Sequence, residues 1–257
     1  MFTRDLLLAS AVAVLLSSSC AAAAPTTSPA IAAAVADTSR PAADVARDPN
    51  RKPAETLTFA GVKPGDRVGD FIANSGYFSR LFADVVGPEG RVYAVELNEI
   101  IKFPNVASGY AGLQAWAKSR SNLSVETVPA RQAVAFAEPL DLFWISQNYH
   151  DLSDKFLGPL DVAAFNRQVY AALKPGGIYI VLDHAAAKGA PVDVTETLHR
   201  IEVDRVKREV EAAGFTLVGE SNLLANPADP HTANVFDASI AGHTDQFLLK
   251  FRRPSGS

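Results

Sequence analysis

The side chains best suited to chemistry in this sequence of 257 residues follow two apolar runs. Tyr149, His150 and Asp151 come shortly after the first run, and Asp183 and His184 end the second. In an open α/β sheet, ligands bind beyond the carboxyl ends of the strands. We therefore expect these side chains to face one crevice, and we predict that they form the catalytic group of an enzyme.

His150 is the candidate general base of this group, because an imidazole titrates near neutral pH. It would take a proton from a hydroxyl, amine or thiol of the substrate, and Asp151 would orient it. The alternative is structural: Asp151 caps a helix that begins at Leu152, and His150 is exposed.

Metal binding is a further alternative for the same strand ends. Asp183, His184 and His150 are residue types that bind metals, but no motif spacing supports a site, and we predict no metal. His199 is predicted on a long helix, as a surface or packing residue.

A second group of candidate residues surrounds Asp70. The apolar run Arg67–Phe71 predicts a strand, the turn Ile72–Gly76 follows it, and an amphipathic helix comes next. A second strand, Arg91–Val95, then delivers Glu96, about 20 residues after the turn. This is the pattern of the first βαβ unit of a nucleotide-binding fold, in which the acid accepts hydrogen bonds from two ribose hydroxyls.

The rest of the sequence alternates between strand and helix. Further strands are predicted at Leu123–Val128, Leu140–Ile145, Ile178–Leu182, Phe215–Glu220 and Gln246–Arg252. Further helices are predicted at Pro41–Arg47, Pro53–Ala60, Tyr110–Lys118 and Asp193–Ala213, and after the capping residue Asp161.

This order predicts an α/β three-layer sandwich with a seven-stranded, mostly parallel Rossmann-like sheet. The last two strands have no helix between them, so we expect the last strand to be antiparallel. Their connection, Ser221–Asp245, is long for a compact domain, and such loops are often functional. It contains His231 and His243, which are candidates to line a lid.

Two stretches resemble the class I S-adenosylmethionine (SAM)-dependent methyltransferases. One is Val68–Glu96, with its acid, its turn and its second acid. The other is the Leu-Lys-Pro-Gly-Gly turn at Leu173–Gly177, directly before the fifth strand. More closely, the chain resembles an exported bacterial group of predicted methyltransferases, which carry the same Tyr-His-Asp and Asp-His sequences. The resemblance covers Arg51–Arg253.

The resemblance implies SAM as the cofactor and a small molecule as the substrate. Asp70 would orient the turn and the methionine amino group, Gly76 would let the backbone approach the cofactor, and Glu96 would hold the ribose. The other expected contacts to the cofactor come from Phe71, Asn74, Ser75, Tyr77 and Asn148.

The turn departs from the family pattern at Ile72 and Asn74, where the family prefers glycine. Asparagine tolerates left-handed backbone angles, whereas isoleucine does so only with difficulty. The alternative is therefore a non-catalytic ligand-binding protein of the cell envelope on the same fold. A nicotinamide dehydrogenase is a third reading, and the antiparallel end of the predicted sheet fits it less well.

The first 24 residues have the layout of a secretory signal peptide, which predicts export to the periplasm or cell envelope. The one cysteine, Cys20, follows the apolar core and three serines and is a candidate for lipid modification, which would be the only membrane attachment. The alternative is a simple cleavage within Ala21–Ala24. Residues 25–40 are predicted to be a linker and residues 41–257 the methyltransferase-like domain. The net charge is −4 and no basic patch with interleaved aromatic residues occurs, which argues against nucleic acid as a partner.

Overall fold

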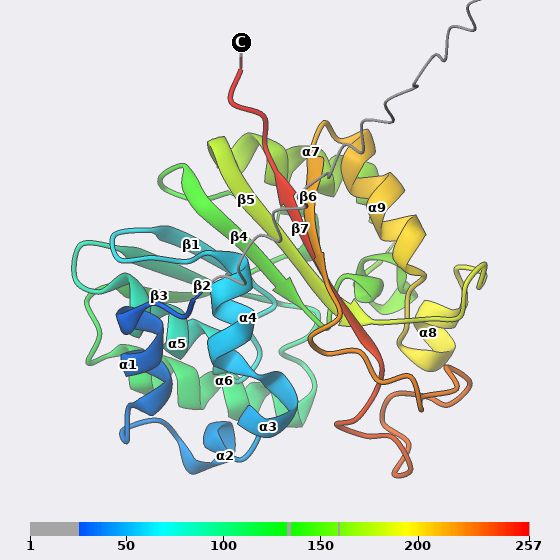
Figure 1. Cartoon of the computed structure of the whole chain (residues 1–257), viewed down its shortest axis with the longest axis horizontal. Coiled ribbons are helices and arrows are strands. Elements are labelled where there is room, and N and C mark those ends of the chain that lie inside the picture. Colours follow the sequence, from blue (N-terminus) through cyan, green and yellow to red (C-terminus); the bar gives the residue numbers. More distant parts are fainter. Residues whose placement is uncertain (1–25, 133–134, 159, 257) are drawn as a thin grey trace, which may run out of the picture.

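The computed structural model describes residues 26–132, 135–158 and 160–256 (Figure 1). The predicted signal peptide and Cys20 lie outside these residues. Within them, no helix combines the length and the apolar character that crossing a membrane requires.

Seven strands form one sheet in the order β3-β2-β1-β4-β5-β7-β6. The strands are β1 (Arg67–Phe71), β2 (Arg91–Leu97), β3 (Leu123–Val128), β4 (Leu140–Ser146), β5 (Leu173–His184), β6 (Thr216–Ser221) and β7 (Gln246–Arg252). Strand β1 pairs in parallel with β2 and β4, whereas β7 is antiparallel to both β5 and β6. The predicted fold class, with its antiparallel last strand, is confirmed.

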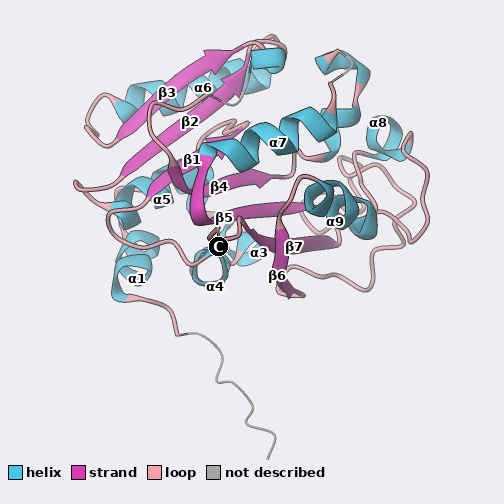
Figure 2. Ribbon diagram, turned by 90° about the horizontal axis from the view of Figure 1, so that it is seen from above, coloured by secondary structure: helices cyan, strands magenta, loops and turns pink. Residues whose placement is uncertain are grey.

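Helices cover both faces of this sheet and make three layers (Figures 1 and 2). On one face lie α1 (Pro29–Ala36), α4 (Pro53–Ala60), α5 (Tyr77–Val86) and α6 (Pro104–Ala117); on the other lie α7 (Val162–Ala172) and α9 (Val203–Ala212). The shorter helices are α2 (Ala42–Val45), α3 (Asp48–Arg51), α8 (Val194–Leu198), η1 (Ala130–Gln132), η2 (His150–Ser153) and η3 (Lys155–Leu157).

Strand β4 shows how the core is divided between the two faces. Successive side chains of a strand point to opposite faces, so Trp144 packs against Phe78 of α5 while Phe143 packs against Phe165 of α7. Trp144 and Phe143 are both fully buried. A strand that is apolar on both sides is typical of a sheet covered on both faces.

The predicted linker at residues 25–40 is wrong in part, because residues 29–36 form helix α1. Ser28 caps the helix by accepting a hydrogen bond from the Ile31 N–H at 3.3 Å. Ile31 and Ala34 are buried and belong to the same core cluster as α4 and α5. The folded domain therefore begins before the predicted Pro41. The small residues that suggested a linker include the alanines that favour a helix.

The predicted long helix Asp193–Ala213 is also wrong, because it is broken into α8 and α9. His199 has a φ of 53° and ends α8 in the left-handed region. Arg200 is fully buried in an ion pair with Asp229, and Ile201 forms a β-bridge with Ala185. The apolar spacing continues across this break, so the periodicity alone did not reveal it.

Candidate active site

A cavity of about 710 Å³ opens at the carboxyl ends of β1 and β4. Its volume is in the range of small-molecule sites. Of the predicted site residues, it is lined by Asp70, Asn74, Ser75, Tyr77, Asn148, His150, Asp151 and His184. The structure thus brings most of the predicted catalytic and cofactor residues to one place.

The turn after β1 keeps a glycine-like backbone without the glycines. Ile72 has a φ of 57° and Asn74 a φ of 51°, so both lie in the left-handed region. The Asn74 side chain donates to the Ile72 carbonyl at 3.0 Å and to Asn148 Oδ1 at 3.2 Å. The expectation that Asn74 maintains the turn is confirmed, and Ile72 adopts it too, at a steric cost.

The Glu96 side chain stabilises this turn by accepting backbone hydrogen bonds. Its Oε2 accepts a hydrogen bond from the Asn74 N–H at 2.9 Å, and its Oε1 accepts one from the Leu97 N–H at 2.8 Å. The side chain is fully buried and is not among the residues that line the cavity. Burial raises the pKa of Glu96 to about 7. Its contact with a ribose stays a prediction.

Charged groups gather at the end of the cavity beside Asp70. The Asp70 carboxylate accepts a hydrogen bond from the Ser79 hydroxyl, and burial raises its pKa to about 7. Arg51 donates to Gln147 Oε1 at 2.7 Å, and its guanidinium lies 4.9 Å from the Tyr77 ring centre. Burial lowers the pKa of Arg51 to about 10, so it stays cationic at neutral pH.

Sequence reasoning missed Arg51 and Arg47, which both line the cavity. Both come from the short helical segments before β1 rather than from a strand end. The weak signal available was their position among basic residues just before Pro53, which begins α4.

Asp183 ties the ends of β4 and β5 together. Its carboxylate accepts hydrogen bonds from the backbone N–H of His150 at 2.8 Å and of His184 at 2.7 Å. His150 Nδ1 lies 2.8 Å from Asp183 Oδ1. Burial disfavours the charged form of Asp183, but His150 outweighs it and lowers the pKa of this carboxyl. The ionised carboxylate only accepts hydrogen bonds, so His150 Nδ1 is the donor.

His150 and His184 differ in charge. Burial disfavours the charged form of His150, but Asp183 and Asp151 outweigh burial and raise its pKa well above the ordinary value. Burial lowers the pKa of His184 to about 4, and its Nδ1 lies 2.7 Å from Thr244 Oγ1. His184 is therefore neutral near pH 7. A protonated imidazole cannot accept a proton. The predicted role of His150 as general base therefore requires a form of the site in which His150 has lost its extra proton.

The predicted site residues Tyr149, Phe71 and Gly76 are also not among the residues that line the cavity. The predicted catalytic role of Tyr149 is corrected, whereas the cofactor contacts of Phe71 and Gly76 stay predictions. The Tyr149 hydroxyl lies in the core, 2.8 Å from Asn166 Nδ2 and 3.1 Å from Glu209 Oε2, too far inside to be catalytic. The Phe71 ring packs on Phe165 with ring centres 5.1 Å apart.

Gly76 is the third of these. It has a φ of 78°, and an added Cβ would lie 2.3 Å from a methyl group of Leu113 in α6. Packing against α6 therefore requires this glycine, and Gly76 is not among the residues that line the cavity.

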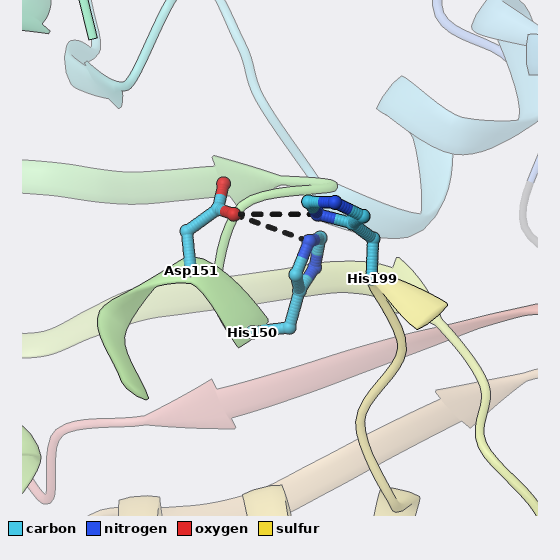
Figure 3. A group of neighbouring side chains, drawn as sticks. All are labelled: His150, Asp151 and His199. Carbon is cyan, nitrogen blue, oxygen red and sulfur yellow. Dashed lines mark ion pairs between the residues drawn. The ribbon is translucent and has the colours of Figure 1, made fainter. Parts of the chain in front are cut away.

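His199 is the main site residue that the sequence placed elsewhere. Because α8 ends at this position, its ring turns into the cavity, 5.5 Å from the ring of His150. Its Nδ1 lies 3.9 Å from Asp151 Oδ1 (Figure 3). No sequence motif links His199 to His150 and Asp151.

The long loop after β6 closes the cavity with other residues than the predicted histidines. Val235 and Phe236 line the cavity, and the Phe236 ring packs on His199 with ring centres 5.0 Å apart. His231 instead lies 2.8 Å from Asp245 Oδ2, and His243 is exposed. The loop contributes to the site, as expected, but neither His231 nor His243 lines the cavity.

Sequence comparison finds relatives among methyltransferases. No family model matches the chain. The chain is 28% identical over 200 residues to the ubiquinone/menaquinone biosynthesis C-methyltransferase UbiE of Teredinibacter turnerae. The match covers 76% of this chain and 68% of that protein, so the chain spans about two thirds of its relative's length.

Structural comparison finds the same class of protein. A SAM-dependent methyltransferase from Aquifex aeolicus matches with a TM-score of 0.54 and 17% identity, over 81% of this chain and 95% of that one. The fold is that of the class I SAM-dependent methyltransferases. The predicted enzyme class and cofactor agree with these relatives. The [4+2]-cyclase SpnF also matches, with a TM-score of 0.57 and 17% identity over 84% of this chain and 82% of that one, so the fold alone does not fix the reaction.

Proposed function

We propose that this chain is a SAM-dependent methyltransferase that acts on a small molecule. The observation that carries the proposal is the cavity at the strand ends of a methyltransferase fold, whose lining includes Asp70, Arg51, His150 and His184. When bound, SAM supplies an electrophilic methyl group. The protein's task is then mainly to position the acceptor and to exclude water.

The charged end of the cavity suits the amino-acid part of SAM, which is a zwitterion. Asp70 offers an acceptor for its ammonium group, and Arg51 and Arg47 offer donors for its carboxylate. The pKa of Asp70, which burial raises to about 7, would fall again beside an ammonium group, because an opposite charge favours the ionised form.

The adenosine part would lie along the apolar wall that Ile72, Ile100 and Val106 form. Glu96 is close in sequence to Ile100 of this wall, but its carboxylate accepts a hydrogen bond from the Asn74 N–H. To hold the ribose hydroxyls as predicted, Glu96 would give up the hydrogen bond from Asn74 and accept hydrogen bonds from the ribose instead. The turn that contains Asn74 would then move.

The acceptor is expected to have a flat apolar body. Phe103, Phe156 and Phe236 line the cavity and are 47%, 39% and 74% exposed, which is unusual for phenylalanine. Aromatic faces favour such ligands. The neutral imidazole of His184 would accept a hydrogen bond from a polar group of the acceptor.

Calorimetry with SAM and S-adenosylhomocysteine tests the cofactor. The wild-type chain is expected to bind both, and Asp70→Asn and Arg51→Gln to weaken binding at least tenfold. The matched controls are Asp193→Asn and Arg208→Gln, on exposed side chains outside the cavity, which are expected to bind as the wild type does. No binding by a folded wild-type sample would contradict the proposal.

The second candidate, a non-catalytic ligand-binding protein, is favoured by one observation. Ile72 places a branched side chain on the cavity wall at a position where the family prefers glycine. This candidate predicts that an apolar small molecule raises the melting temperature while neither SAM nor S-adenosylhomocysteine does. The same calorimetry therefore separates the two candidates.

We also propose that the chain is exported to the periplasm or cell envelope, like the exported bacterial predicted methyltransferases that it resembles. The support is the layout of residues 1–24. Cell fractionation of the full chain tests export, and a Cys20→Ser variant tests the anchor. A lipid anchor predicts that the variant leaves the membrane fraction; a simple cleavage predicts that both proteins are soluble.

A further inference from the structure

We propose that His150, Asp151 and His199 bind a divalent transition-metal ion at the wall of the cavity. Each residue offers one ligand atom, and these atoms lie within 4.8 Å of one another (Figure 3). All of them line the cavity. The inference does not depend on methyl transfer.

His150 is already oriented as a metal ligand. Its Nδ1 donates to the buried Asp183 carboxylate at 2.8 Å, and its backbone N–H donates to the same carboxylate. Histidines that bind metals commonly donate their other ring N–H to a carboxylate, which fixes the ring and leaves the second nitrogen for the ion. Here that second nitrogen is Nε2, which lies 3.3 Å from Asp151 Oδ1.

The space between these atoms requires a positive charge. A bare Nε2 and a carboxylate oxygen are both hydrogen-bond acceptors, so at 3.3 Å they repel unless a cation lies between them. A proton meets this need for His150 and Asp151 alone. A metal ion would meet it for all three residues, because His199 Nδ1 lies 3.9 Å from the same oxygen.

The spacing suits an ion after a small adjustment. In a tetrahedral zinc site with bonds of about 2.0–2.1 Å, neighbouring ligand atoms are roughly 3.3 Å apart. The His150–Asp151 pair has this separation, and His199 Nδ1 needs to approach the Asp151 oxygen by less than an ångström. Two imidazoles and one carboxylate suit Zn²⁺ or Fe²⁺, and such three-ligand sites leave a coordination position open.

His199 is held in this place by the break between α8 and α9. The next residue, Arg200, is fully buried and bonds Asp229 at 2.9 Å and the Ala185 carbonyl at 3.0 Å. These bonds of Arg200 therefore fix the left-handed backbone of His199, and the His199 ring faces the cavity. The open position of the ion would face the acceptor, so an oxygen or nitrogen of the acceptor could bind there.

Zinc titration of the full chain, first freed of metal with a chelator, tests the site. Calorimetry is expected to give one Zn²⁺ per wild-type chain, and Co²⁺ is expected to give the visible absorption of a low-coordinate site. His199→Gly is expected to weaken Zn²⁺ binding at least tenfold; glycine suits the φ of 53° at this position. Asp183→Asn is expected to weaken it by roughly 10- to 100-fold, because it removes the partner of His150.

His243→Gly is the matched control, since it removes an exposed histidine outside the cavity. Circular dichroism of each metal-free variant confirms the fold. The proposal is overturned if the folded wild type binds no Zn²⁺, or if His199→Gly and His243→Gly bind it equally well. Because no SAM is present, these results are independent of the SAM calorimetry.

Discussion

At the scale of single residues, Ile72 lines the cavity at a position where the methyltransferase pattern prefers glycine. Replacing it by glycine relieves a φ of 57°, a conformation that costs a branched residue about 1–2 kcal/mol. It also removes a buried side chain, whose loss costs about 2–5 kcal/mol. We predict that Ile72→Gly lowers the melting temperature, because the lost packing outweighs the relieved strain, and raises SAM affinity several-fold, as measured by calorimetry.

Ile72→Val is the matched control for this prediction, because valine keeps the branched Cβ and the backbone strain. It is expected to bind SAM as the wild type does. Weaker SAM binding by Ile72→Gly would mean that the side chain supports the cofactor rather than restricting it.

The buried acids Asp70 and Glu96 give stability a pH dependence. Burial raises both pKa values to about 7, from ordinary values of 3.8 and 4.5, so between these limits the folded chain holds more protons than the unfolded chain. Stability must then fall as the pH rises through this window. Among the charged groups around them, Arg51 favours ionisation of Asp70, whereas Asp70 and Asp151 oppose ionisation of Glu96.

We predict that Glu96→Gln reduces this loss of stability between pH 5 and pH 8, because a neutral amide has no proton to lose. Urea unfolding at several pH values measures the effect. Glu89→Gln, in the Gly-Pro-Glu-Gly turn outside the cavity, is the control and should retain the wild-type slope. An unchanged slope in Glu96→Gln would show that Glu96 is ionised throughout.

At the scale of elements, the break between α8 and α9 is the feature that completes the site. Arg200 and Asp229 form a fully buried ion pair that joins this break to the long loop after β6. Removing one partner of such a pair leaves an uncompensated buried charge and costs about 3–5 kcal/mol. We predict this loss for Arg200→Met in urea unfolding, with Arg208→Met, on a side chain that is 69% exposed, as the neutral control.

The strands were predictable from the sequence because each is a short run with a clear apolar pattern between turns. Strands β1, β3 and β7 have the predicted bounds, and the others differ by a few residues, apart from β5, which begins earlier, at Leu173. The antiparallel last strand followed from the missing helix before it. These features depend on local sequence, so local reasoning recovered them.

The site was only partly predictable, because its remaining residues depend on tertiary contacts. His199 enters the cavity through a helix break that Arg200 and Asp229 cause, and these two are far apart in sequence. Arg51 enters because the segment before β1 folds back over Tyr77. Tyr149 points away because its hydroxyl has partners in the core. None of these contacts leaves a pattern along the chain.

At the scale of the whole molecule, helix α1 decides where the folded domain begins. Ile31 is 2% exposed and packs with α4 and α5, so the layer that covers one face of the sheet includes this helix. Deleting the methylenes of a buried isoleucine costs about 2–5 kcal/mol. If α1 instead frayed independently as part of a linker, the cost to the rest of the chain would be within about 0.5 kcal/mol.

We therefore predict that Ile31→Ala lowers the urea midpoint of the entire chain in one cooperative transition, with an unchanged dependence on urea concentration. Tryptophan fluorescence reports this well, because Trp144 is fully buried under α5, far from Ile31 in sequence. Val192→Ala, on a side chain that is 47% exposed, is the control. A midpoint that Ile31→Ala leaves unchanged would place α1 outside the cooperative unit, whereas the predicted shift makes it part of the domain that carries the cavity.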